Sequence, residues 1–130
     1  MFIIDPRSST PIYQQIIEGV KENILKGLLE PGDRMPSVRE LAKMMTLNPN
    51  TVAKAYQELE RQKVIETFRG KGTFVSMEYE AKKDGEKMVE LKDIFKKGIV
   101  EAYYMGIDKK EIMNIIDEII KELEGGAKHD

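Results

Sequence analysis

The chain has 130 residues, of which 41% are hydrophobic and 34% charged, and its formal net charge at pH 7 is −2. This composition describes a folded, well-solvated protein rather than a disordered one, and the length suits one compact domain with an appendage. There is no Cys, which excludes disulfides and thiolate chemistry. We recognise no signal peptide and no apolar run long enough to span a membrane, so we expect a cytoplasmic protein without membrane contact.

The charge is unevenly distributed along the chain. Residues 1–76 contain 11 Lys and Arg against 9 Asp and Glu, a difference of +2, whereas residues 77–130 contain 10 against 14, a difference of −4. The first part has the sign that suits nucleic acid, but its excess is small. Binding to DNA would therefore depend on where the cations lie, and pairing of two chains would double the phosphate contacts.

The N-terminal residues predict an arm followed by a helix. Residues 2–5 (FIID) are apolar enough for a short strand or for an arm that docks on the core. Thr10 and Pro11 suit the N-cap and first position of a helix that ends at Gly27. Helical spacing gives this helix a core-facing stripe of Tyr13, Ile16, Ile17, Val20 and Ile24.

Two short helices joined by a tight turn follow in residues 37–61. Ser37 and Glu40 form a capping box for the first, and Asn48 and Pro49 supply the N-cap and first residue of the second. The residues expected to face the core are Val38, Leu41, Ala42, Met45, Val52, Ala55, Tyr56 and Leu59. The outer face of the second helix keeps Asn50, Ala53, Lys54, Gln57 and Arg61. This pattern is typical of a helix-turn-helix, although an ordinary packed helix pair shares it.

After the second helix, a β-hairpin is predicted by the run VIETFRGKGTFVSM. Apolar and aromatic residues flank a tip of Arg69, Gly70, Lys71 and Gly72, whose glycines permit the positive φ of a tight reversal. Such a hairpin is a wing, and its two cations can reach a phosphate or a minor groove. We therefore expect a mainly α fold with a small β-hairpin wing, in which residues 1–76 form a winged helix-turn-helix DNA-binding domain.

The C-terminal part predicts a polar linker, residues 77–87, and a two-helix hairpin, residues 88–125. The apolar stripes of the two helices include Met88, Leu91, Phe95, Ile99, Ile112, Ile116, Ile119 and Leu123. A hairpin of this size cannot bury both stripes by itself. It could fold back on its own winged helix, but we favour pairing with the same hairpin of a second chain, because a homodimer also presents two recognition helices to two half-sites.

The second helix of a helix-turn-helix reads bases with its N-terminal turn. Asn50 carries an amide that suits adenine, whereas Asn48 either caps the helix or reads a base. Thr51 can bond a phosphate or its own helix, and Lys54 and Gln57 are candidates for phosphate or base contacts.

These motifs together resemble a known family. The runs GLLEPGDRMPSVRELAKMM, LNPNTVAKAYQELERQKVIE and RGKGTFV are similar to the N-terminal domain of the GntR family of bacterial transcription regulators, and the NPNTV turn and short tail are similar to its YtrA subfamily. The resemblance implies a sequence-specific DNA-binding regulator, with repression as the expected output, that pairs through its tail. Thr46 departs from the family, where Gly is common, and a β-branched residue would be strained there if φ is positive.

The resemblance also bears on single residues. It implies that Arg39, the arginine of the P-S-x-R motif, contacts DNA, and some relatives have Arg at the position of Ala53, whose methyl group could touch thymine. Arg34 can reach a phosphate or pair with Asp33 or Glu40, and Ser37 is expected mainly to cap its helix. The candidate DNA-binding residues are Arg34, Ser37, Arg39, Asn48, Pro49, Asn50, Thr51, Ala53, Lys54, Gln57, Arg69, Gly70 and Lys71.

An enzyme is not expected, and neither is a cofactor or a metal site. The single His, His129, lies near the C-terminus, no nucleotide-binding or catalytic motif stands out, and the acidic residues of the last helix suit a solvated face. Two alternatives stay open. One is a winged helix used for protein–protein contact, and the other is a sensor whose unknown small-molecule effector binds between the tails, near Met88, Met105 and Met113.

Overall fold

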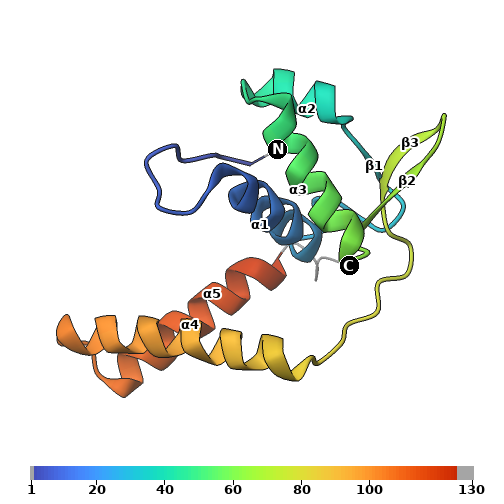
Figure 1. The fold of residues 1–130 in the computed structure, drawn as a ribbon. Helices are drawn as coiled ribbons and strands as arrows, with labels where there is room; N and C mark the ends of the chain where they lie inside the picture. The colour runs from blue at the N-terminus through green and yellow to red at the C-terminus, as the bar shows by residue number, and fades with distance from the viewer. Residues whose placement is uncertain (1, 126–130) are drawn as a thin grey trace. The chain divides into compact units, whose positions relative to one another are not determined.

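The computed structural model describes residues 2–125 and divides them into two compact units, one containing the chain up to Tyr79 and the other running from Glu80 to Leu123 (Figure 1). The elements of the first unit are α1 (Ile12–Leu25), β1 (Arg34–Met35), α2 (Val38–Met45), α3 (Pro49–Arg61), β2 (Ile65–Phe68) and β3 (Gly72–Val75). Those of the second are α4 (Gly85–Tyr104) and α5 (Lys109–Gly125). None of the helices in the described residues combines the length and apolar character needed to cross a membrane.

The core of the first unit lies between its three helices and one face of a small sheet. The buried apolar residues are Ile16, Ile17, Val20, Met35, Leu41, Ala42, Val52, Ala55, Tyr56, Leu59, Val64, Ile65 and Val75. The stripes predicted from helical spacing are thus confirmed, with Tyr13, Ile24, Val38 and Met45 packed at the margin of the core. The expected mainly α fold with a β wing is also confirmed.

The sheet has one strand more than the hairpin expected from the sequence. Its order is β1-β3-β2, with all pairs antiparallel, and Arg34 of β1 lies opposite Phe74 of β3. Met35, the second residue of β1, is buried. The third strand therefore joins the chain just before α2 to the wing, as Figure 1 shows.

The start of α1 differs from the expectation by one residue. Its N-cap is Pro11 rather than Thr10, and no side chain caps the helix. Gln15 instead holds the arm: its amide nitrogen donates to the carbonyl oxygens of Asp5 (2.8 Å) and Thr10 (2.9 Å), and its amide oxygen accepts from the Asp5 N–H (2.8 Å). Phe2 packs so closely on Gly19 that a Cβ there would lie 2.6 Å from its ring. Residues 2–5 form a docked arm, not a strand.

The turn between α2 and α3 contains a β-branched residue with a positive φ, the strained arrangement considered for Thr46 from the sequence. Thr46, the C-cap of α2, adopts φ 54° and ψ 52°, the left-handed conformation. Its N–H still bonds the carbonyl of Lys43, and the next residue, Leu47, packs against the core. A β-branched residue is unfavourable in this conformation, and the surrounding packing holds it there.

We expect Thr46→Gly to stabilise the domain by about 0.5–1 kcal/mol, because the relief of left-handed strain outweighs the added flexibility of the unfolded chain. Lys63→Gly is the matched control, since Lys63 also has a positive φ, 62°, but is not β-branched. Urea unfolding of the two variants should show the larger gain at position 46. A loss of stability in Thr46→Gly would contradict this account.

The second unit consists of two helices, α4 and α5, that contain no buried residue. Asp84 caps α4 by accepting from the N–H of Glu86 (2.8 Å), so the helix begins at Gly85, inside the segment 77–87 expected to be a linker. Asp108 accepts from the Glu111 N–H (2.9 Å) at the start of α5. Most residues of the apolar stripes of the two helices are exposed, whereas Ile112 and Leu123 are half-buried.

Candidate nucleic-acid interface

The first turn of α3 presents polar side chains from a fixed backbone. Asn48 accepts the Asn50 N–H at its Oδ1 atom (2.8 Å), and Pro49 occupies the first helical position. Asn48 therefore caps the helix through its side-chain oxygen. Asn50 and Gln57 are exposed, whereas Thr51 and Ala53 are half-buried. Helix α3, which lies wholly within the described residues, exposes no large apolar side chain.

Two cations of α3 have partners within the protein. The Lys54 ammonium lies 3.8 Å from the centroid of the Tyr13 ring, a cation–π contact that fixes its position on the flank of the helix. Arg61, expected to be free on the outer face, instead binds Glu58 through Nε (2.9 Å) and Nη2 (2.6 Å). This hydrogen-bonded carboxylate raises the pKa of the Arg61 guanidinium.

The start of α2 is a complete capping box. The Ser37 hydroxyl accepts the Glu40 N–H (3.1 Å), and the Glu40 carboxylate accepts the Ser37 N–H (2.8 Å). These bonds to Ser37, helped by the charge of Arg34, hold the pKa of the Glu40 carboxyl below its usual range. Ser37 is thus mainly a cap, as expected. Arg39 is exposed on the first turn of α2, beside this cap.

The Arg34 side chain lies against the wing next to its tip, at Gly72. A Cβ added to Gly72 would lie 3.2 Å from the Arg34 Nε atom, so Arg34 would have to shift by a few tenths of an ångström, and the φ of 120° would strain any other residue at position 72. Asp33 accepts the Glu30 N–H (2.8 Å), and Arg34 forms no ion pair within residues 2–125. Both roles that the sequence leaves open for Arg34, a phosphate contact and an interaction with a carboxylate, stay predictions, and the charge of Arg34 acts on Glu40.

The tip of the wing carries two exposed cations. The Lys71 N–H bonds the Phe68 carbonyl (2.9 Å) to close the turn, and Gly70 has φ 80°. Arg69 and Lys71 are both exposed. Phe68 is 49% exposed with its ring 6.0 Å from that of Phe74, so an aromatic side chain accompanies the cations. The sequence itself shows this aromatic residue directly before the basic tip, which is a signal for a DNA-facing side chain.

Two contacts join these parts into one surface. The ladder between β1 and β3 places Arg34 beside the wing (Figure 1). The Tyr56 hydroxyl, on α3, donates to the Pro36 carbonyl (2.7 Å), just before α2. Burial of this phenol, together with the nearby Glu40 charge, raises its pKa and keeps it a neutral donor. The start of α2, helix α3 and the wing are therefore held in fixed positions relative to one another.

Comparison with known proteins identifies the family. Residues 12–75 match the family model described as bacterial regulatory proteins, gntR family. The chain is 49% identical over 130 residues, all of both proteins, to the HTH-type transcriptional repressor YtrA of Bacillus subtilis (strain 168). The chain belongs to the GntR family. This GntR protein also resembles a crystal structure named a transcriptional antiterminator from Listeria monocytogenes EGD-e, with a TM-score of 0.84, 42% identity and coverage of 97% of this chain and 94% of that one.

One structure similar to this GntR protein contains operator DNA. The DNA-binding domain of AraR in complex with operator ORX1 is similar to this GntR protein over 58% of its length and 93% of the AraR chain, with 28% identity and a TM-score of 0.51. The prediction of a DNA-binding transcription regulator is confirmed at the level of the family. His129 lies outside the described residues.

Proposed function

We propose that this GntR protein represses transcription in the cytoplasm by binding an inverted-repeat operator in double-stranded DNA as a homodimer. One observation supports this most strongly: the start of α2, the first turn of α3 and the wing tip form one connected surface that exposes Arg39, Asn50 and Lys71. A winged helix-turn-helix puts its second helix in the major groove and uses flanking cations on the phosphates. The names of YtrA, a repressor, and of AraR with its operator agree with this proposal.

Each group of side chains has a separate role in the proposal. Asn50 reads a base, since it is exposed on the first turn of α3 and its side chain ends in an amide that can both donate and accept. Phosphates or, at the wing, the minor groove are contacted by the basic side chains, which are Arg34, Arg39, Lys54, Arg69 and Lys71. The remaining residues of the surface either fix the protein backbone or touch the DNA backbone and bases. They are Ser37, Asn48, Pro49, Thr51, Ala53, Gln57 and Gly70.

The second unit supplies the homodimer contact. Leu91 is 43% exposed, Phe95 60% and Ile119 49%, which is a large apolar surface for a chain in water. The same stripe of a second chain, related by a two-fold axis, can pack against this surface and remove it from water. The proposed pairing surface consists of Met88, Leu91, Phe95, Ile99, Ile112, Ile116, Ile119 and Leu123, and residues 1–76, 77–87 and 88–125 act as reader, linker and dimerisation tail.

Alanine variants should separate the readers of bases from the binders of phosphates. We expect Arg69→Ala or Lys71→Ala to weaken binding to operator and scrambled DNA alike and to reduce the salt slope by about one unit each. Asn50→Ala should instead lose discrimination between the two DNAs by about 1–3 kcal/mol, because a bidentate base contact is removed. Titrations by fluorescence anisotropy at several salt concentrations measure both effects.

The matched control is Lys82→Ala, which removes an exposed cation of the second unit and should change neither affinity nor salt slope. If Asn50→Ala weakened binding to every sequence equally, Asn50 would not be a base reader. An unchanged salt slope in Lys71→Ala would remove the wing from the interface.

A further inference from the structure

The wing exposes one large apolar side chain among its cations. Phe68, the last residue of β2, is 49% exposed, and β2 and β3, which both lie within the described residues, expose no other large apolar side chain. Single exposed apolar side chains are common on protein surfaces, so exposure alone assigns no role. The position of Phe68 in the sheet and the charges around it indicate what the ring contacts.

The register of the hairpin places Phe68 on the outer face of the sheet. Side chains alternate between the two faces of a strand, and the paired, buried Ile65 and Val75 define the face that packs on the core. Phe68 and its diagonal neighbour Phe74 therefore lie on the opposite face, with their ring centroids 6.0 Å apart. The residue directly opposite Phe68 is Gly72, which has no side chain to cover the ring. Half of the Phe68 side chain is thus left in water.

The charges around Phe68 are mainly positive. Arg69 and Lys71 follow it at the tip, and the Arg34 side chain lies against the residue opposite it in β3. The only acidic residue of β2 and β3 is Glu66, which lies two residues further from the tip. An apolar ring bordered by cations matches the minor groove of DNA, where apolar deoxyribose surfaces lie between two rows of phosphates.

The wing is also long enough to present this ring to DNA. Figure 1 shows the β2–β3 hairpin extending away from the helices of its unit. A hairpin that reaches past the helices can lie in the minor groove while α3 occupies the adjacent major groove. Proteins that bind the minor groove frequently place apolar side chains next to their cations.

We propose that Phe68 packs its ring against deoxyribose in the minor groove, and that it thereby gives the wing an apolar contact whose strength does not depend on salt. This inference rests on the proposed function, because it requires the wing to lie on DNA. It assigns to Phe68 a part of the binding energy that the cations of the tip do not supply.

Alanine at position 68 separates the apolar contact from the charged ones. Phe68→Ala should weaken operator binding about fivefold for each wing engaged, because the exposed half of the side chain no longer leaves water on binding. The salt slope should stay unchanged, since no charge is removed, and Phe68→Leu should retain most of the affinity. Fluorescence anisotropy at several salt concentrations measures both quantities. Unchanged affinity in Phe68→Ala, or a reduced salt slope, would overturn the inference.

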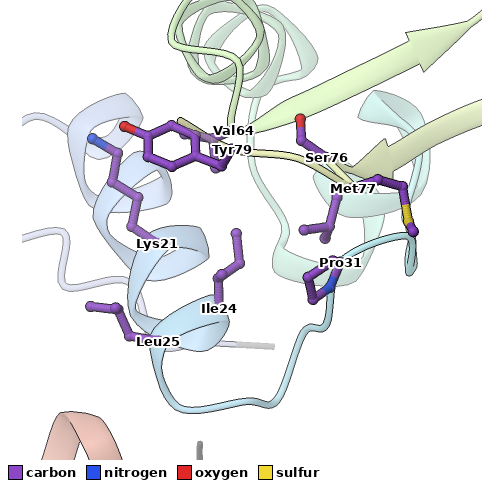
Figure 2. Close-up of a pocket in the computed structure, with 9 residues that line it drawn as sticks. Lys21, Ile24, Leu25, Pro31, Val64, Ser76, Met77 and Tyr79 are labelled. Atoms are coloured by element: carbon purple, nitrogen blue, oxygen red, sulfur yellow. The ribbon is translucent and has the colours of Figure 1, made fainter. Parts of the chain in front are cut away.

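The matched control is Tyr79, an aromatic residue of the same unit that is 57% exposed. Figure 2 shows Tyr79 in the lining of a cavity beside α1, outside the wing. Tyr79→Ala should leave both operator affinity and salt slope unchanged. A loss of affinity equal to that of Phe68→Ala would mean that the effect does not come from the wing, and the role of Phe68 would be wrong.

Tryptophan fluorescence reports the contact itself, since the chain contains no Trp. Saturating DNA should lower the acrylamide quenching constant of Phe68→Trp, because the ring leaves the solvent, and should leave that of Tyr79→Trp unchanged. A purely structural role, in which Phe68 only steadies the wing through Phe74, lowers affinity in Phe68→Ala without shielding the ring. Unchanged quenching in Phe68→Trp on DNA would therefore overturn the proposed contact.

Scrambled DNA at low salt separates this inference from the proposed function. A contact with deoxyribose carries no sequence information, so scrambled DNA should also shield the ring in Phe68→Trp. Shielding on scrambled DNA without preference for any operator would contradict sequence-specific repression and support the Phe68 contact. Preference for an operator without shielding would overturn the Phe68 contact alone, and a chain that binds neither DNA would contradict both.

Discussion

The double variant Leu91→Asp, Phe95→Asp should be a soluble monomer at concentrations at which the unaltered chain is a dimer. Both side chains are exposed on α4, at 43% and 60%, and neither is part of the winged-helix core. Burying the exposed part of these two side chains from each partner contributes about 3–6 kcal/mol to the dimer, so their replacement by carboxylates should weaken it about 10²- to 10⁴-fold. Sedimentation equilibrium measures the change directly.

A control variant and a stability measurement show whether the effect comes from the apolar stripe. The control Lys92→Asp, Lys96→Asp alters charge more strongly at two exposed positions of the same helix but leaves the apolar stripe intact, and it should remain a dimer. Thermal unfolding of the winged-helix unit should be unchanged in both variants, because its core contains none of the four residues. A Leu91→Asp, Phe95→Asp chain that still sediments as a dimer would remove the tail from the proposed interface.

The monomer also has a defined consequence for DNA. It should retain the weak, salt-dependent binding of a single winged helix and lose most of its preference for a complete operator, since linked sites gain 10²- to 10⁴-fold from effective concentration. The same variant thus links the apolar surface of α4 to the function proposed for the α3 surface.

The helices of this fold are predictable because their signals are local. Ser37, Glu40 and Asn48 lie within three residues of the backbone groups that they bond, so the sequence alone indicates where α2 and α3 begin. The stripe of α3 from Val52 to Leu59 likewise requires only the helical period. Strand β1 has no such signal, because two residues carry no alternation and their partner strand lies beyond the whole helix-turn-helix.

The sequence proposes which residues make up the candidate site but not the contacts among them. The pairing of Lys54 with Tyr13 joins α1 to α3, and the crossing of Arg34 over Gly72 depends on the β1–β3 ladder. Neither can be inferred before the chain is folded. The pairing of Arg61 with Glu58 is different, since charges three residues apart on a helix face each other and this spacing was visible in the sequence.

A change in half-site spacing should have the second large effect. Two identical subunits related by a two-fold axis recognise an inverted repeat whose half-sites lie on one face of the duplex, about one helical turn apart. Inserting about five base pairs, half a turn, places the second half-site on the opposite face, so only one winged helix engages at a time. Affinity should then fall about 10²- to 10⁴-fold, to that of a single half-site.

Footprinting on matched probes tests this geometry. An insertion of about ten base pairs restores the face but lengthens the separation, so it reports how far the segment between the two units can extend. Protection of both half-sites should disappear with the half-turn insertion, and the isolated half-site should bind the native dimer and the Leu91→Asp, Phe95→Asp monomer with similar affinity. Undiminished affinity for the half-turn probe would mean that each subunit binds independently, and the two-fold arrangement on DNA would be wrong.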